Sequence, residues 1–203
     1  MSADVRFVDE TDWGFGWIAP EPRFLQRCSH AFRVDGGVWV VDPVAGEGVV
    51  ERIRALGEPA GVLVLFGRHD RDSRRVAAEL GVARYPPEQP PPDPPFQIVR
   101  LSRGELALWL PEREALVVSE ALGTVQYMRA PGELLGLHPF RRLAPPRRLN
   151  AFDPLHVLVG HGEGLHGPDA SAALHDVLDH GPARTLSWLA AGLRAHGPWA
   201  RRR

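Results

Sequence analysis

The feature that most constrains the fold is an alternation of short β-type runs with helical stretches in the first half of the chain. Residues 32–34 and 38–42 flank the sequence Asp-Gly-Gly, which predicts a hairpin because glycine tolerates the positive φ of tight turns. Residues 47–56 and 74–80 place apolar side chains at helical spacing. Between them, GVLVLF at 61–66 is continuously apolar, which is typical of a strand buried on both faces. This order of hairpin, helix, strand and helix predicts a layered α/β sandwich.

The second half of the chain repeats this pattern of strands followed by helices. Three β-type runs separated by turn-like sequences precede a further short strand, and two amphipathic stretches closed by glycine predict helices. The strands are expected at residues 96–101, 105–110, 115–120 and 157–160, and the helices at 169–181 and 183–197. Residues 124–148, in contrast, contain four prolines that interrupt any long element.

A proline-rich segment, YPPEQPPPDPPF at 85–96, separates the two halves. Such a sequence favours polyproline II geometry and enters neither a helix nor a central strand. It is typical of an interdomain linker or a recognition peptide, but we interpret it as a stiff surface connection within one domain that spans residues 1–203.

Composition and charge exclude several classes of function. The formal net charge is −1, so the bulk electrostatics recruit neither nucleic acid nor an anionic membrane. No apolar run approaches the roughly 20 residues that cross a bilayer. The one cysteine, Cys28, forms no internal disulfide, and the N-terminal residues lack the pattern of a signal peptide. We therefore expect a cytoplasmic protein.

Four segments, in this order, resemble the metallo-β-lactamase superfamily. AFRVDGGVWVVDPV is similar to the early hairpin of that superfamily, and GVLVLFGRHDRDSRRVAAELGVARY to the strand, loop and helix that carry its HxHxDH motif. LALWLPEREALVVSEAL resembles the strand pair that leads to a metal-bridging Gly-Asp, and LNAFDPLHVLVGHGEG resembles the closing strand with its Gly-His-Gly loop. The resemblance implies an α/β fold, a four-layered αββα sandwich of two mixed sheets.

The resemblance also implies a metal centre on loops at the strand ends, although most of its histidines are replaced. In the HxHxDH loop, Arg68 and Asp70 take the places of the first two histidines, and Ser73 takes the place of the last. The motif aspartate corresponds to Asp72, and His69 falls on a spacer position that binds no metal. The usual two-metal hydrolase centre is therefore not expected.

The remaining positions of the implied centre are only partly kept. The bridging aspartate corresponds to Glu120, and the final histidine to His161 of the Gly-His-Gly loop. A further histidine of the superfamily would lie at 101–104, where the sequence Leu-Ser-Arg-Gly has none.

Two interpretations of this remnant pocket remain. In the first, which we favour, no metal binds, because Arg68 places a guanidinium where a metal would sit and offsets the carboxylates. In the second, one Mn, Fe, Mg or Zn ion binds to three oxygen ligands and one nitrogen ligand. Those ligands would be Asp70, Asp72, Glu120 and His161.

Each of these residues also has a purely structural interpretation. Asp72 can be the N-cap of a helix, and Asp70 can belong to a solvated charge cluster with neighbouring arginines. Glu120 can be an exposed strand-end carboxylate, and His161 can be kept for its turn. Cys28 and His30 would share one face of a strand, but no third group is evident that would orient them as a catalytic pair.

The function expected from the sequence is therefore that of a divergent, non-catalytic protein, either ligand-binding or accessory, with a small molecule as its ligand. One alternative is a hydrolase of ester or thioester substrates that uses an atypical mononuclear metal site. The other is an interaction module that forms homo-oligomers through the proline-rich segment and tryptophan-bearing surfaces.

Overall fold

The first half of the chain forms a mixed six-stranded sheet with two helices on its outer face. The structure is a computed structural model that describes residues 4–19 and 25–196. The strands are antiparallel from β1 to β4 and parallel from β4 to β6. Their order is β1 (Arg6–Val8), β2 (Gly14–Ile18), β3 (Cys28–Val34), β4 (Gly37–Val41), β5 (Glu58–Leu63) and β6 (Arg84–Tyr85), and the helices are α1 (Val49–Leu56) and α2 (Ser73–Leu80).

The second half forms a mixed five-stranded sheet. Its order is β13 (Leu165–His166), β12 (His156–Val159), β9 (Ala115–Val118), β8 (Leu106–Leu110) and β7 (Gln97–Arg100), with β12 and β9 parallel and the other pairs antiparallel. Helix α3 (Asp169–His180) covers its outer face and α4 (Thr185–His196) follows. A two-stranded ribbon joins β10 (Leu122–Gly123) to β11 (Gly136–Leu137). Five 3₁₀ turns complete the fold: η1 (Gly67–His69), η2 (Ser102–Gly104), η3 (Pro111–Arg113), η4 (Pro139–Arg141) and η5 (Arg147–Ala151).

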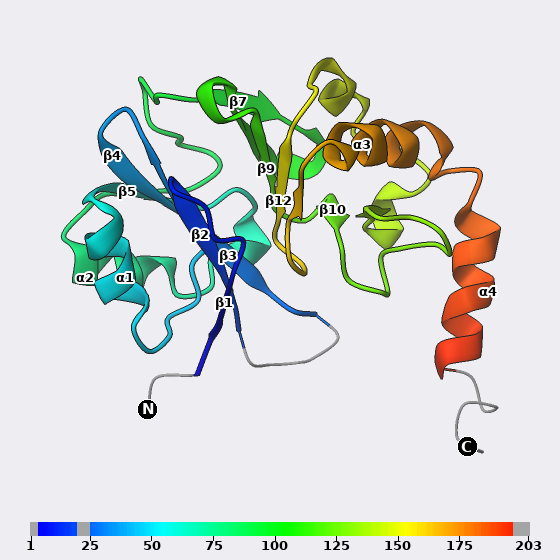
Figure 1. Ribbon diagram of the computed structural model, residues 1–203, viewed down its shortest axis with the longest axis horizontal. Helices are drawn as coiled ribbons and strands as arrows, with labels where there is room; N and C mark the ends of the chain where they lie inside the picture. The colour runs from blue at the N-terminus through cyan, green and yellow to red at the C-terminus, as the bar shows by residue number, and fades with distance from the viewer. Residues whose placement is uncertain (1–3, 20–24, 197–203) are drawn as a thin grey trace.

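The two sheets pack face to face, and β9 shows how its sequence specifies both faces. Ala115 and Val117 belong to the core between the sheets, whereas Leu116 and Val118 belong to the core beneath α3. Successive side chains of a strand point to opposite faces, so a continuous apolar run supplies both cores. Figure 1 shows α1 and α2 outside one sheet and α3 outside the other. The predicted αββα sandwich of two mixed sheets is confirmed.

Most of the expected elements form, but β1 and β2 were not anticipated. Strand β2, GFGWI, holds two glycines, which weaken a strand signal. They stand there because neighbouring atoms approach closely: a side-chain carbon at Gly14 would lie 2.6 Å from the carbonyl oxygen of Ala31 on β3. The proline-rich segment leads from β6 of one sheet to β7 of the other.

Residues 124–148, which predicted no clear element, fold into turns around buried side chains. Met128 and Leu135 are fully buried, and Arg142 forms an ion pair of 2.7 Å with Glu133 in which both side chains are inaccessible to solvent. The indole N–H of Trp188 on α4 donates to the carbonyl of Tyr127 at 2.6 Å, which attaches the last helix to this region.

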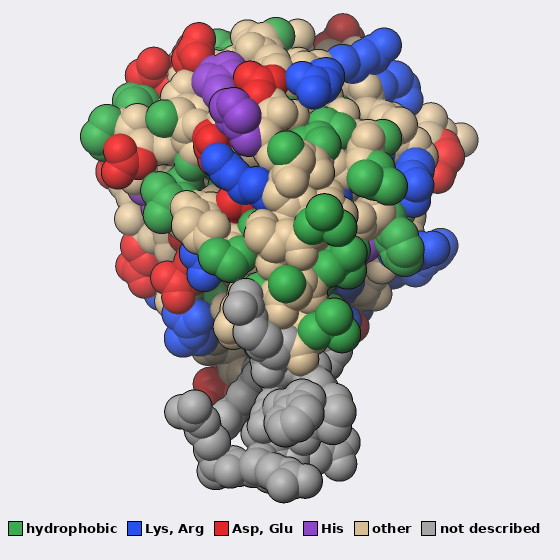
Figure 2. Space-filling model, turned by 90° about the vertical axis from the view of Figure 1, so that its right-hand side faces the viewer, with side chains coloured by type: hydrophobic (Ala, Val, Ile, Leu, Met, Phe, Trp, Pro, Cys, Tyr) green, Lys and Arg blue, Asp and Glu red, His purple; other side chains and the backbone are tan. Residues whose placement is uncertain are grey.

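Helix α4 lies at the far end of the molecule (Figure 1) and exposes apolar residues. Leu186, Leu189 and Leu193 are all exposed, and hydrophobic side chains gather on the lower half of this face (Figure 2). Gly197, which was expected to close the helix, lies outside the described residues. Among the described residues, no helix combines the length and apolar content that crossing a bilayer requires.

Candidate functional site

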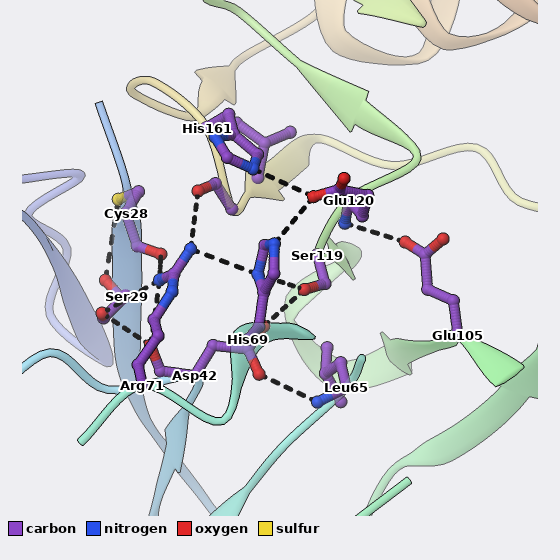
Figure 3. A network of polar contacts seen from close by, with 12 residues as sticks. Cys28, Ser29, Asp42, Leu65, His69, Arg71, Glu105, Ser119, Glu120 and His161 are labelled. Carbon is purple, nitrogen blue, oxygen red and sulfur yellow. Dashed lines mark hydrogen bonds and ion pairs between the residues drawn. The ribbon is translucent and has the colours of Figure 1, made fainter. Parts of the chain in front are cut away.

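Four polar residues in the segments that follow strands meet at one edge of the two sheets. Asp42 follows β4, and His69 ends the turn η1 after β5. In the other sheet, Glu120 follows β9 and His161 follows β12. Each pair of strands, β4 with β5 and β9 with β12, is parallel, so the carboxyl ends of both strands lie at the same edge. The packing of the sheets then brings the two edges together (Figure 3).

The carboxylate of Glu120 is the centre of this cluster. Its Oε2 lies 2.7 Å from Nε2 of His69 and 3.1 Å from Nε2 of His161, and its Oε1 lies 3.2 Å from Nε2 of His138. Burial raises the pKa of Glu120, but the hydrogen bonds with His161 and His69 outweigh this effect and hold the pKa well below its ordinary range. Glu120 is therefore ionised, and the imidazoles lie around a buried negative charge.

The outer ring nitrogen of His69 contacts two further polar groups. Its Nδ1 lies 2.7 Å from Oγ of Ser119 and 3.3 Å from Oδ2 of Asp42. The Ser119 hydroxyl donates to the same Asp42 oxygen at 2.5 Å, and the other Asp42 oxygen accepts the N–H of Leu65 at 2.9 Å. Burial and the charge of Arg71 lower the pKa of His69, but hydrogen bonds to Asp42 and Glu120 prevail and raise it. The Asp42–Ser119 pair thus fixes the orientation of the imidazole.

The outer ring nitrogen of His161 donates to the carbonyl of Leu25, at 2.9 Å between the two atoms. This contact directs Nε2 at the Glu120 carboxylate, 3.1 Å from its Oε2. The flanking glycines of the Gly-His-Gly loop have separate structural causes. A side-chain carbon at Gly160 would lie 2.3 Å from the carbonyl oxygen of Ser119, and Gly162 has a φ of +94°. Only glycine meets both requirements without strain.

Arg71 supplies the buried cation of the site. It has a φ of 45°, uncommon for a residue with a side chain, and this turn directs it inward. Its guanidinium donates to the carbonyls of Cys28 at 2.6 Å, Asp42 at 3.0 Å and Gly160 at 3.2 Å, and Nη2 lies 3.1 Å from Nδ1 of His69 (Figure 3). Burial lowers the pKa of Arg71. The guanidinium thus ties both strand edges to the cluster.

The structure brings together only part of the pocket predicted from the sequence. Glu120 and His161 meet, as the resemblance implies, and they are joined by His69, which had been assigned to a spacer position. Arg68, expected to be the internal cation, is exposed instead. The loop turns at Arg71, and this turn exchanges the expected roles of the two arginines.

Asp70, Asp72 and Ser73 engage other partners near the start of α2. Asp70 accepts hydrogen bonds from Ser73 and from the guanidinium of Arg84, and Oδ2 of Asp72 accepts the N–H of Ala45 at 2.9 Å. The group whose donor atoms lie within 4.8 Å of one another contains Glu120 and His161 but neither Asp70 nor Asp72, so it differs from the four-residue set of the alternative interpretation. Asp72 holds the N-cap position of α2 but makes no side-chain capping bond there.

A cavity of about 600 Å³ opens beside Glu120. Arg68 and Arg103 line it, and both are exposed. Its remaining lining residues include aromatic, acidic and basic side chains: Phe66, Glu88, Glu120, His138, Phe140 and Arg141.

The buried carboxylate of Glu105 fixes the backbone of Glu120. Oε1 of Glu105 accepts the N–H groups of Glu120 at 2.9 Å and Ala121 at 2.8 Å, and its Oε2 pairs with Arg141 at 2.6 Å. Burial raises the pKa of Glu105, while these hydrogen bonds and Arg141 act in the opposite direction. Glu105 therefore sets the position of Glu120 at the cavity wall.

The donor set fits one metal ion and does not fit two. Two imidazole nitrogens and one carboxylate oxygen, from His69, His161 and Glu120, lie within 4.8 Å of one another, and this is a ligand set that zinc accepts. Both imidazoles are oriented through their outer nitrogens, as metal-binding histidines commonly are. The guanidinium of Arg71 lies 3.1 Å from Nδ1 of His69, the ring nitrogen that faces away from Glu120. Its positive charge would repel a second cation there.

Comparison with solved structures identifies the fold. The sequence matches no protein-family model and no curated protein. The structure is similar to a crystal structure of the DIM-1 metallo-β-lactamase exposed to ceftazidime, with a TM-score of 0.57 and 14% identity over 92% of this chain and 98% of that one. It is also similar to the TMB-1 structure, with a TM-score of 0.57 and 12% identity over 90% of this chain and 97% of that one. The chain therefore has the metallo-β-lactamase fold.

Proposed function

We propose that the protein binds one divalent transition-metal ion through His69, Glu120 and His161, and that it is a hydrolase acting on a small anionic substrate. The observation that carries this proposal is the convergence of two Nε2 atoms on a single oxygen of Glu120, at 2.7 and 3.1 Å. From the sequence alone a metal-free pocket is favoured, because only one histidine falls on a ligand position. With His69 in the cluster there are two imidazoles, and the donor set suits zinc.

The charge balance supports binding of a divalent cation. Glu120 and Asp42 carry two negative charges around the cluster, against the one positive charge of Arg71. The two terminal nitrogens of Arg71 also donate to three backbone carbonyls, so its charge is partly offset before a metal arrives. A single ion is therefore compatible with the site, and a second one is opposed.

The cavity supports the choice of an anionic substrate. Arg68 and Arg103 line its wall, and arginine pairs with carboxylate and phosphate groups through two parallel hydrogen bonds. A metal ion held by His69, Glu120 and His161 would supply an acidified water molecule and would polarise the bond to be cleaved. The residues of the chain orient the substrate: Arg68 and Arg103 hold its anionic group, and His138 lies beside Glu120, where it can hold a proton at Nε2.

A metal-free pocket that binds an anion is the second candidate. It is favoured by the 2.7 Å separation of His69 and Glu120, a hydrogen-bond length that is shorter than the spacing of two ligands around one ion. In that case the His69 imidazole, whose pKa is raised, offsets the charge of Glu120, and the arginines bind the ligand without chemistry.

An assay panel separates the two candidates. Purified protein is tested on carboxylate-bearing esters, thioesters and phosphoesters, with Zn²⁺ or Mn²⁺ and with a chelator. We expect turnover that the chelator abolishes and that His161→Ala lowers at least 100-fold, while Asp72→Asn retains it. Tight binding of an anionic product analogue to chelated protein, with no turnover under any metal condition, would establish the second candidate instead.

A further inference from the structure

A second group of ligand-type side chains lies apart from the Glu120 cluster. Asp9 follows β1, and Cys28 and His30 lie on one face of β3. A carboxylate oxygen, the sulfur and a ring nitrogen of these residues lie within 4.8 Å of one another. The side chain of Asp9 is 3% exposed and that of His30 is 2% exposed, and Cys28 is fully buried. We propose that Asp9, Cys28 and His30 bind one zinc-class metal ion in a buried structural site.

Two of the three donor atoms have no hydrogen-bond partner among the described residues. These atoms are Oδ2 of Asp9 and Nδ1 of His30, and both are buried. A buried polar atom without a partner is costly, and native proteins contain few of them. A cation between the two atoms removes that cost for both.

The distance between these atoms suits a metal better than a hydrogen bond or a bridging water. They are 3.9 Å apart, which is too long for a direct hydrogen bond. A water molecule that bridges them with ordinary geometry would hold them about 4.6 Å apart. An oxygen and a nitrogen bound to one tetrahedral zinc ion lie about 3.3–3.5 Å apart. The two atoms would therefore approach by about half an ångström on binding an ion.

The other atoms of Asp9 and His30 are anchored so that the donor atoms face each other. Nε2 of His30 lies 2.9 Å from the carbonyl oxygen of Val159, to which it donates, so a neutral ring carries its lone pair on Nδ1. Oδ1 of Asp9 accepts the N–H of Gly164 at 2.8 Å and contacts Nε2 of His166 at 3.1 Å. Metal-binding histidines commonly donate their second N–H to a backbone carbonyl in this way.

Glycine keeps the space beside the two donor atoms open. Gly16 on β2 lies opposite His30 in the sheet register. A side-chain carbon at Gly16 would lie 2.9 Å from Oδ2 of Asp9 and 3.0 Å from Nδ1 of His30. Alanine at this position would therefore occupy the space next to both donors.

The donor types select the class of metal. Thiolate, imidazole and carboxylate together suit zinc and cobalt, whereas calcium and magnesium prefer oxygen alone. Burial raises the pKa of the Cys28 thiol well above its ordinary value, so metal binding must release that proton. Because Asp9 and His30 also contact the β12–β13 region, a bound ion would fasten the edge of one sheet to the other.

Titration with Co²⁺ tests this site separately from the Glu120 cluster, which contains no sulfur. Chelator-treated protein is titrated with Co²⁺ while the near-ultraviolet charge-transfer band of a cobalt–thiolate bond is recorded. We expect the band in the wild type and in Glu120→Gln, its loss in Cys28→Ala, and one fewer bound equivalent in Cys28→Ala than in the wild type. Absence of the band in the wild type at saturating Co²⁺ would overturn the proposal, whatever happens at Glu120.

Two further variants and one control variant keep the test informative if Cys28→Ala fails to fold. Gly16→Ala should abolish the band, whereas Gly67→Ala, where a side-chain carbon meets no atom within 4 Å, should retain it. His166→Ala removes the anchor of Asp9 and should weaken Co²⁺ binding roughly 10–100-fold while the band remains. Unchanged affinity in both Gly16→Ala and His166→Ala would contradict the assignment of Asp9 and His30 as ligands.

Discussion

Nε2 of His69 lies 2.7 Å from Oε2 of Glu120, although the two residues are 51 positions apart and belong to loops of different sheets. His69 follows β5 of the first sheet, and Glu120 follows β9 of the second. The contact therefore depends on how the inner faces of the two sheets pack. Side chains in that core, such as Phe32, Leu65 and Leu108, fix the spacing of the loops that carry the site.

Arg71 is predicted to be essential for stability, whereas Arg68 is not. Arg71→Met removes the donor to the backbone carbonyls of Cys28, Asp42 and Gly160, which should cost about 1–3 kcal/mol of unfolding free energy for each buried acceptor left without a partner. Arg68→Met changes an exposed side chain and should stay within about 0.5 kcal/mol. Urea denaturation of the two variants measures the difference, and equal midpoints would show that Arg71 is not the internal cation.

Gly160 is predicted to tolerate no side chain. Gly160→Ala places a carbon against the carbonyl of Ser119 and close to the ring of His69, which should destabilise the fold by about 1–3 kcal/mol and displace the imidazole. Gly67→Ala, in the same edge region but facing open space, is the matched control and should be close to neutral. Thermal unfolding of both variants tests this prediction, and similar melting temperatures would contradict it.

Glu105 is predicted to act on the metal site through the backbone of Glu120. Glu105→Gln weakens the acceptor for two N–H groups and leaves Arg141 without its carboxylate, so metal affinity should fall roughly 10–100-fold. Glu112→Gln removes an exposed carboxylate and should bind metal as the wild type does. Calorimetric titration with Zn²⁺ compares them. An unchanged affinity in Glu105→Gln would mean that Glu120 holds its position without this support.

Asp70 is predicted to stabilise the fold in a pH-dependent way, and it is not predicted to bind a metal. Partial burial raises its pKa, but hydrogen bonds from Ser73 and Arg84 outweigh this effect and lower the pKa below its ordinary value. The stabilisation is therefore present above the unfolded-state pKa of about 3.9 and is lost as the pH falls through the lower folded-state pKa.

The corresponding measurement compares Asp70→Asn with the wild type. The variant should be less stable at pH 7 by up to about 1 kcal/mol, because the ion pair is partly exposed, and this gap should close at strongly acidic pH. Asp93→Asn, at an exposed position of the proline-rich segment, controls for the change in net charge. A gap that is independent of pH would argue against the ion pair of Asp70 with Arg84.

The architecture could be predicted from the sequence because its strands are unusually regular. Runs such as 61–66 and 115–118 are apolar on both faces, which requires a layer on each side of every sheet. The sequence did not predict strand β2, because glycine has a low strand propensity. Gly14 and Gly16 occupy the strand because neighbouring atoms leave no room for a side chain there.

The site was predictable only where the sequence motif and the backbone agree. Glu120 and His161 stand two positions after the ends of β9 and β12, so their order along the chain places them. His69 falls on a spacer position of the motif, so motif spacing alone does not predict its place beside Glu120. The positive φ of Arg71, which no residue type signals, likewise hides the inward course of its guanidinium.

The number of metal ions bound by Glu120→Gln, compared with the wild type, tests the central claim most directly. Each protein is freed of metal, equilibrated with excess Zn²⁺, passed through a desalting column and analysed for zinc and protein. We predict that Glu120→Gln retains one equivalent fewer than the wild type, and that Asp72→Asn, which alters a carboxylate outside the cluster, retains the same number as the wild type. Equal zinc content in Glu120→Gln and the wild type would contradict a metal centre at His69, Glu120 and His161.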